Sequence, residues 1–162
     1  SLSNGQNFIT IQEEQRHIES YLKIQQFRYQ DTLAYNIDID KALYNFTIPK
    51  LLLQPLVENA LVHGIRGKRG KGRISVTGRL EGGNIVFCVT DDGVGMDEEK
   101  LYNLRKASVA GSTQSANIAA FGVGNVNERI HIYYGENYGL FFKSQPDVGT
   151  TARVLIPARN VS

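Results

Sequence analysis

The sequence contains a single cysteine, Cys88, and none of its apolar runs approaches the length of about 20 residues that a membrane-spanning helix needs. One cysteine cannot form a disulfide within the chain or supply a cysteine-rich zinc site. Cys88 lies in an apolar strand pattern, which predicts a small buried side chain. No segment has the pattern of a signal peptide. These absences predict a globular protein suited to a reducing compartment.

The sequence also lacks a large excess of charge of either sign, because 18 basic and 16 acidic residues leave a net charge of +2. No strong field therefore favours nucleic acid or a membrane surface, and we expect no nucleic-acid partner and no direct membrane contact. The 162 residues, 41% hydrophobic and 21% charged, are enough to bury the core of one domain.

Periodicity and turn signals predict an alternation of helices and strands. Thr10 and Glu13 form a capping box for a helix over 11–30, with Glu14 among the residues on its solvent side. His17 on this helix could be a phosphoacceptor, but a solvated histidine is the favoured interpretation. The further predicted elements are a strand at 33–39, a helix at 50–62, a hairpin at 73–80 and 84–90, helices at 97–106 and 125–134, and strands at 138–144 and 151–156.

Proline and glycine set the expected limits of the second helix. Pro49 is expected in its first turn, Pro55 is expected to kink it, and Gly64 is expected to cap its C-terminus. Asn59 and His63 are four residues apart and should share one face. Polar groups on a buried face need partners, which local groups or water could also supply.

The turn that begins at Asp91 is the first candidate site. It reads Asp91-Asp92-Gly93-Val94-Gly95 and follows a run of strand-forming residues at 84–90. An aspartate at a strand end can accept a hydrogen bond from an exocyclic amine such as that of adenine, and glycines let a flat ring approach the backbone. Asp-Gly turns are also common in hairpins, so the turn alone does not decide between the two interpretations.

Two glycine-containing stretches could also serve a ligand. Residues Ala107–Ala119 are small and polar without periodicity, which predicts a mobile lid. Phe121-Gly122-Val123-Gly124 leads into a helix, so free backbone N–H groups there could hold a phosphate. The basic stretch Arg66–Gly72 more often forms a solvated connection than a phosphate site.

Four segments resemble the motifs of the histidine-kinase ATP-binding domain, in the same order and with similar spacing. Leu53–Gly64 resembles its N-box, Asp91–Met96 its G1 box, Phe121–Ile130 its G2 box, and Gly149–Thr151 its final glycine-threonine element. The runs Gln-Pro-Leu-Val-Glu-Asn and Asn-Val-Asn-Glu-Arg are similar to the LytS/YesM type of sensor kinase, closest to YesM-like proteins.

The resemblance implies an α+β fold, a two-layer α/β sandwich. In it, three helices cover a mixed, mostly antiparallel sheet, and an N-terminal helix precedes it. It also implies two parts. Residues 1–31 would lead from a dimerisation and phosphoacceptor region, and residues 32–162 would form the ATP-binding domain.

The resemblance further implies ATP and Mg²⁺ as ligands. Asn59 would bind the metal and Asp91 the adenine amine, while His63 would contact phosphate or ribose. Glu58 and Asn59 are the implied catalytic residues. The other implied cofactor-binding residues are Gly93, Gly95, Met96, Phe121, Gly122, Val123, Gly124 and Thr150.

Several departures from the family pattern keep alternatives open. Pro55 replaces the carboxylate that activates water in related ATPases, which disfavours a hydrolytic ATPase. Ala120 replaces the first glycine of the G2 box, and Val62 stands where a basic residue is common. These two changes favour the alternative of a degenerate nucleotide-binding or dimer and partner-interaction module without phosphotransfer.

The leading hypothesis is the catalytic domain of a two-component sensor histidine kinase. It would pass the γ-phosphoryl group of ATP to a histidine outside this chain and then to a response-regulator protein. The resemblance implies a homodimer in the full-length protein. It also implies a cytoplasmic location for this domain in a membrane-anchored bacterial sensor.

Overall fold

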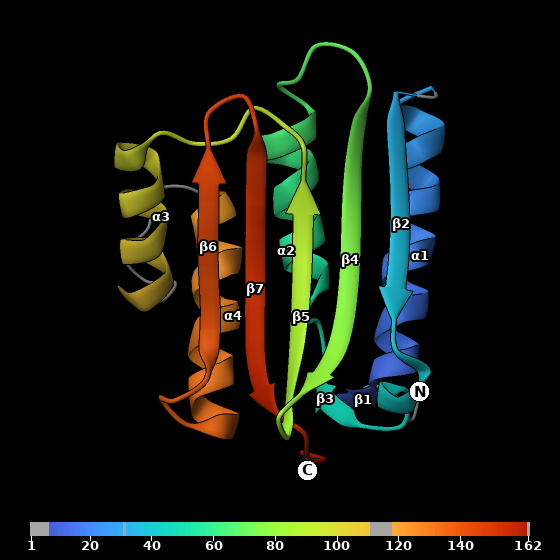
Figure 1. Cartoon of the computed structure of the whole chain (residues 1–162), viewed down its shortest axis with the longest axis vertical. Coiled ribbons are helices and arrows are strands. Elements are labelled where there is room, and N and C mark those ends of the chain that lie inside the picture. The colour runs from blue at the N-terminus through green and yellow to red at the C-terminus, as the bar shows by residue number, and fades with distance from the viewer. Residues whose placement is uncertain (1–6, 31, 111–117, 162) are drawn as a thin grey trace.

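The computed structural model describes residues 7–30, 32–110 and 118–161, and within them five strands form one sheet in the order β2-β4-β5-β7-β6 (Figure 1). β4 pairs with β5, β5 with β7 and β7 with β6 in antiparallel fashion, whereas β2 runs parallel to β4. The strands are β2 (Leu33–Ile39), β4 (Gly72–Glu81), β5 (Asn84–Asp91), β6 (Gly139–Gln145) and β7 (Gly149–Pro157).

Helices α1 (Ile11–Arg28), α2 (Gln54–Asn59) and α4 (Ile118–Tyr134) lie behind the sheet in Figure 1, and α3 (Glu98–Ala110) lies beside β6. Ile85, Phe87 and Val89 of β5 point to the helices and are buried in the core. This arrangement confirms the predicted α+β sandwich with three helices over a mixed sheet.

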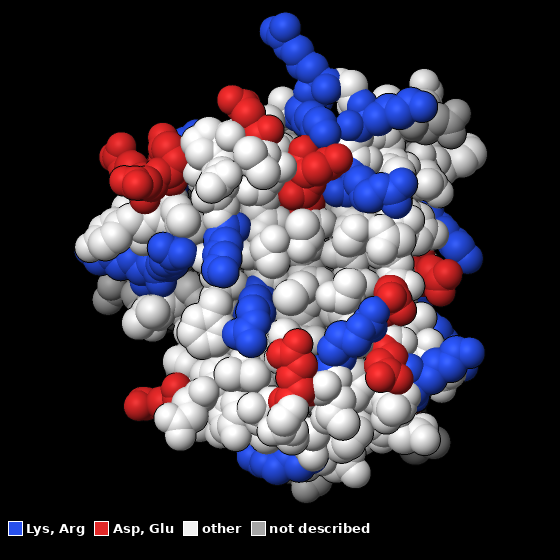
Figure 2. Space-filling model, in the orientation of Figure 1, with Lys and Arg blue, Asp and Glu red and all other residues white. Residues whose placement is uncertain are grey.

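The opposite face of the sheet carries polar and charged side chains, with basic and acidic residues interspersed over it (Figure 2). Arg79 pairs there with Asp38 at 2.6 Å. Cys88 is half-buried rather than buried as predicted, because it lies on this face of β5 opposite Thr77 and Arg153. Within the described ranges, no helix is long and apolar enough to cross a membrane.

The first helix, the hairpin of β4 and β5 and the last two strands confirm the sequence prediction. The Thr10 hydroxyl accepts a hydrogen bond from the Glu13 N–H at 3.1 Å, and the Glu13 carboxylate accepts one from the Thr10 N–H at 3.0 Å. One prediction on this helix is wrong. Glu14 was expected in solvent, but it is 0% exposed. His17 is exposed, as a solvated histidine would be.

The expected limits of the second helix are wrong. Thr47–Pro49 forms a short strand, β3, which pairs with β1 (Phe8–Thr10), and α2 begins only at Gln54. Pro49 ends a strand because the residue before a proline favours extended backbone. Pro55 stands in the first turn of α2, where its missing N–H leaves no hydrogen bond unmade, and the expected kink has no basis.

The helix also continues past the expected cap at Gly64. It runs on as a π-helical segment, η3 (Ala60–Ile65), and its last turn closes with a hydrogen bond from the Arg66 N–H to the Leu61 carbonyl at 2.9 Å. Turns of this wide kind are frequent at functional sites.

Two helix boundaries near the expected lid also differ from the prediction. α3 extends to Ala110, and α4 begins at Ile118 rather than near Asn125, since Ala119 and Ala120 favour helix. The predicted lid at 107–119 is therefore helical at both ends, and its residues 111–117 lie outside the described residues.

Candidate functional site

The carboxyl group of Asp91 lies at the end of β5, where the residue is 5% exposed. Its Oδ1 accepts a hydrogen bond from the Gly93 N–H at 2.9 Å. On its other side it touches Gly64 of η3, where an added Cβ would lie 2.4 Å from Oδ1. The Asp91 turn and the segment that follows the N-box helix therefore meet at this carboxyl group.

Burial raises the pKa of the Asp91 carboxyl from 3.8 to about 6. The backbone N–H groups of Gly93 and Thr150 oppose the rise, the neighbouring charge of Asp92 adds to it, and Lys68 reduces it. At neutral pH the group is mainly ionised and can accept hydrogen bonds from a ligand. A buried acid with a shifted pKa in a turn is typical of functional sites.

Gly93 and Gly95 are required by close contacts between backbone segments. An added Cβ on Gly93 would lie 2.2 Å from the Gly64 carbonyl carbon, and one on Gly95 would lie 1.9 Å from the Gln145 carbonyl oxygen. Gly95 also has a φ of +67°, which favours glycine. Backbone packing thus explains these glycines without reference to a flat ring.

Thr150 stands opposite Asp91 in the register of β5 and β7, and a hydroxyl network fixes its side chain. The Ser144 hydroxyl lies 2.7 Å from Thr150 Oγ1 and accepts a hydrogen bond from the Met96 N–H at 2.8 Å. Met96 and Thr150, which the sequence predicts at the site, are therefore linked. The sequence analysis missed Ser144, which has no motif of its own and reaches Thr150 only through strand register.

The N-box side chains differ in exposure. Asn59 ends α2 and is half-buried, whereas His63 is exposed. Partial desolvation of its ring and then the charge of Arg66 lower the pKa of His63, which favours the neutral imidazole. Glu58 accepts a hydrogen bond from the Gln54 amide at 3.2 Å. The pKa of Tyr21 on α1 is raised mainly by burial and, second to that, by the negative charge of Glu58. The hydrogen bond of Glu58 thus stays within α2, and its charge acts on α1 through space.

The G2 segment differs from its expected geometry. Phe121, Gly122, Val123 and Gly124 lie within α4 rather than before its first turn. Only the first four N–H groups of a helix lack a partner within it. Because α4 begins at Ile118, the N–H groups of Gly122 and Gly124 come later and donate hydrogen bonds within the helix. The Val123 side chain is buried in the core.

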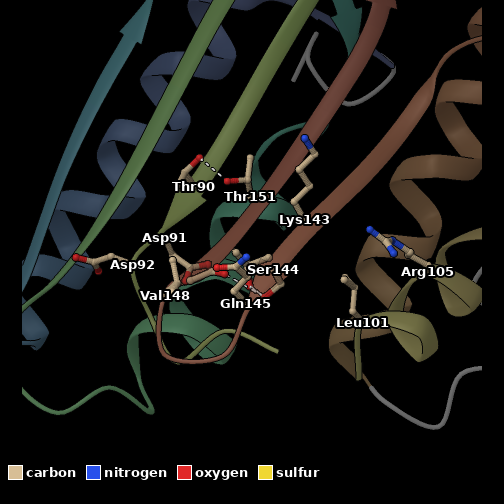
Figure 3. A pocket seen from close by; sticks show the side chains of 12 residues that line it. Thr90, Asp91, Asp92, Leu101, Arg105, Lys143, Ser144, Gln145, Val148 and Thr151 are labelled. Carbon is tan, nitrogen blue, oxygen red and sulfur yellow. Dashed lines mark hydrogen bonds between the residues drawn. The ribbon is translucent and has the colours of Figure 1, made fainter. Parts of the chain in front are cut away.

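A cavity of about 510 Å³ adjoins the Asp91 turn, between the hairpin of β6 and β7 and helix α3 (Figure 3). Thr90, Thr151 and Lys143 occupy one row of the open sheet face, and the two threonine hydroxyls lie 3.1 Å apart. Because side chains alternate along a strand, the Asp91 carboxyl points to the other face, onto Gly64. The cavity thus lies on the open face of the sheet, whereas the Asp91 carboxyl lies on the helix side.

A mixed sheet with helices on one face and a buried strand-end carboxyl against the N-box segment are the features expected of an α+β ATP-binding domain of the histidine-kinase type. The family model described as "Histidine kinase-, DNA gyrase B-, and HSP90-like ATPase" matches residues 47–160, and the chain belongs to this family.

Individual relatives fit this assignment. The chain is 33% identical over 160 residues to the sensor histidine kinase YesM of Bacillus subtilis, an alignment that spans 99% of this chain and 26% of YesM. It is 30% identical over 155 residues to the sensor protein LytS of Staphylococcus haemolyticus, which covers 96% of this chain and 26% of LytS. The chain thus spans about a quarter of the length of these curated relatives.

Solved structures agree on the fold. The catalytic domain of histidine kinase ThkA, in a nucleotide-free form, superposes with a TM-score of 0.69 at 12% identity, over 95% of this chain and 99% of that one. The Erythrobacter litoralis EL346 blue-light activated histidine kinase gives a TM-score of 0.66 at 18% identity, over 93% of this chain and 42% of that one.

Proposed function

We propose that this chain is the ATP-binding catalytic domain of a sensor histidine kinase of the LytS/YesM type. The Asp91 carboxyl carries the proposal, because it is buried, ionised at neutral pH and fixed by the Gly93 N–H at 2.9 Å. An adenine amine can donate a hydrogen bond to it. The family match and the names of the relatives support ATP as the ligand.

Asn59 is the proposed Mg²⁺ ligand. An amide oxygen is a hard donor that suits Mg²⁺, an ion that commonly takes one or two protein ligands and completes its shell with phosphate oxygens and water. Its half-buried position at the end of α2 fits this role. When bound, the metal neutralises charge on the phosphates. His63, neutral and exposed, is suited to donate a hydrogen bond to phosphate or ribose.

The remaining roles follow the sequence prediction. Met96 and Thr150, linked through Ser144, would support the adenine end together with Gly93 and Gly95. Phe121, Gly122, Val123 and Gly124 would offer backbone N–H groups to the phosphates, which requires the first turns of α4 to rearrange on binding.

Glu58 and Asn59 are the proposed catalytic residues in the full-length kinase. Glu58→Gln should lower phosphotransfer to the acceptor histidine with little change in ATP affinity. Asn59→Ala should lower both quantities, since it removes the metal ligand. Transfer of ³²P from labelled ATP, measured beside calorimetric affinity, separates the two effects. Equal phosphotransfer by Glu58→Gln and wild type would remove Glu58 from the mechanism.

The larger setting is part of the proposal. Residues 1–31 would lead from the dimerisation and phosphoacceptor region, and residues 32–162 would form the catalytic domain. The full-length protein would be a homodimer that passes the phosphoryl group to a response-regulator protein. The domain would lie on the cytoplasmic side of a membrane-anchored bacterial sensor.

Calorimetric titration with Mg²⁺ and a non-hydrolysable ATP analogue tests the proposal. The wild-type chain should bind, and Asp91→Asn should bind about 10- to 100-fold more weakly, since a hydrogen bond to a charged group contributes about 1.5–3 kcal/mol. Asp92→Asn is the matched control, because the exposed Asp92 carboxylate contacts Lys68 at 3.2 Å and should leave affinity unchanged.

No heat of binding to the wild-type chain at millimolar ligand would overturn the proposal. The alternative of a partner-interaction module without phosphotransfer would then account better for the chain.

A further inference from the structure

Glu14 is a fully buried carboxylate on α1 that reaches the start of the N-box helix. Its Oε2 accepts a hydrogen bond from the Leu53 N–H at 2.7 Å. Leu53 is the N-cap residue of α2, and no side-chain cap from within α2 bonds this end. A carboxyl group from another helix therefore satisfies a free N–H group at the start of α2.

The turn before α2 is held from its other side as well. Arg129 of α4 donates hydrogen bonds to the Leu51 carbonyl at 3.1 Å and to the Lys50 carbonyl. Leu51 has a φ of +60°, a left-handed conformation that is unfavourable for leucine and persists only when the surroundings impose it. Glu14 and Arg129 are two side chains that impose it, so the turn Lys50–Leu53 joins α1, α2 and α4.

Burial of Glu14 is unfavourable in itself. Desolvation raises the pKa of its carboxyl, against backbone hydrogen bonds from the 51–54 region that lower it. Within the described ranges its Oε1 has no hydrogen-bond partner. A polar group that is buried with one oxygen unmatched stabilises the fold poorly, and an apolar side chain would fill this place at lower cost. The contact with Leu53 is therefore better explained by what it positions.

We propose that Glu14 is a positioning residue that couples α1 to the nucleotide site by fixing where α2 begins. The proposal rests on the function proposed above. Asn59 lies six residues beyond Leu53, about 9 Å along a rigid helix. The same helical run continues to Gly64, which contacts the Asp91 carboxyl. A shift of α1 therefore moves the proposed metal ligand and the wall of the adenine end together.

Glu14→Gln and Glu14→Ala test this coupling in the 162-residue chain. Glutamine can still accept from the Leu53 N–H but loses the charge, whereas alanine loses both. We expect the Mg²⁺–ATP-analogue Kd to rise about 5-fold for glutamine and at least about 20-fold for alanine. Hydrogen exchange at the Leu53 and Val57 amides should speed up in the same order.

Gln26→Ala is the matched control for general weakening of α1. It removes the hydrogen bond from the Gln26 amide to the Leu33 carbonyl at 3.0 Å, near the other end of the same helix. It should lower Tm and leave the nucleotide Kd unchanged. A structural role alone would instead make Kd follow Tm across all three variants, and that result would overturn the proposal.

Hydrogen exchange keeps the two proposals separate. If the wild-type chain binds no nucleotide, the proposed function fails, and exchange at Leu53 still decides whether Glu14 fixes the start of α2. If Glu14→Ala does not fold, Arg129→Lys probes the same turn from α4 and should raise Kd and speed exchange at Leu53. If Glu14→Gln and Arg129→Lys both kept the wild-type Kd and the wild-type rate of hydrogen exchange at Leu53, the coupling would be excluded.

Discussion

At the scale of single residues, Asp91 is an acid whose buried position disfavours its ionised form. Its folded pKa of about 6 lies above the ordinary value of 3.8, so the folded chain holds the proton more tightly than the unfolded chain. The free energy of unfolding therefore falls as pH rises from about 4 to 6, by about 3 kcal/mol in total. Above about pH 6 the Asp91 carboxyl is ionised in the folded chain, and the full loss in the free energy of unfolding is present.

Asp91→Asn should consequently stabilise the ligand-free chain at pH 8 by about 1–3 kcal/mol, because asparagine keeps the acceptor for Gly93 without the buried charge. The advantage should shrink as pH falls to about 4, where the wild-type carboxyl is protonated. Urea unfolding of the wild-type chain and of Asp91→Asn at several pH values measures it. Parallel stability curves for the wild-type chain and Asp91→Asn would contradict the assigned pKa.

Glu14 illustrates how far single residues could be predicted. It follows Ile11 by three positions and precedes Ile18 by four, so helical spacing alone puts it on the buried stripe. Its charge led to the wrong prediction of a solvent position. The spacing could have corrected that, but its partner, the Leu53 N–H, could not be predicted because tertiary packing brings the two helices together.

At the scale of elements, the contact between the turn after β5 and η3 depends on two glycines, Gly93 and Gly64. An added Cβ on either residue would clash with the other segment. Gly93→Ala would drive a Cβ to 2.2 Å from the backbone of Gly64, which cannot move without shifting η3. We expect a loss of about 2–4 kcal/mol in the free energy of unfolding and a loss of nucleotide binding.

Gly67→Ala is the control for this element contact. Its added Cβ would meet only the Val94 side chain at 3.4 Å, an ordinary contact. Chemical denaturation should place this variant within about 0.5 kcal/mol of the wild-type chain. Similar losses in the two variants would show that the β5–η3 contact has no special role.

Element boundaries were the least predictable part of the fold. Pro49 and Pro55 each suit the first turn of a helix, and local sequence did not choose between them. Tertiary contacts decide where the helix begins. β1 pairs with Thr47–Pro49 and holds it as a strand, and Glu14 accepts a hydrogen bond from the N-cap of the helix that begins at Gln54. The pairing of β1 with β3 has no local signal, because three-residue strands show no periodicity.

At the scale of the whole molecule, nucleotide binding should be visible as thermal stability. At a ligand concentration of 100 times Kd, mass action adds about 2.7 kcal/mol. For a chain of this size that corresponds to a rise in Tm of about 5–10 °C. Scanning calorimetry with Mg²⁺ and the ATP analogue measures the rise, with Mg²⁺ alone as the control. An unchanged Tm at saturating ligand would contradict binding to the folded state.

The fold class as a whole could be predicted, because strand alternation and four motifs in order agree on one architecture. The site could be predicted only as a set of candidates. Asp91 and Thr150 are brought together by register, whereas Ser144, Gly64 and Arg129 act through contacts that no local pattern encodes. The helical state of Gly122 and Gly124 also depends on residues upstream of their motif.

The strand order has a consequence for how the protein folds. The hairpin of β4 and β5 closes at Glu81 and Asn84, and the hairpin of β6 and β7 closes at Gln145 and Gly149, so each can form early from local contacts. Asp91 belongs to the first hairpin and Thr150 to the second. The proposed adenine end is thus absent from either folding unit and arises when β7 docks on β5, a slow long-range step. A ribosome must release nearly the whole chain before any nucleotide can be bound.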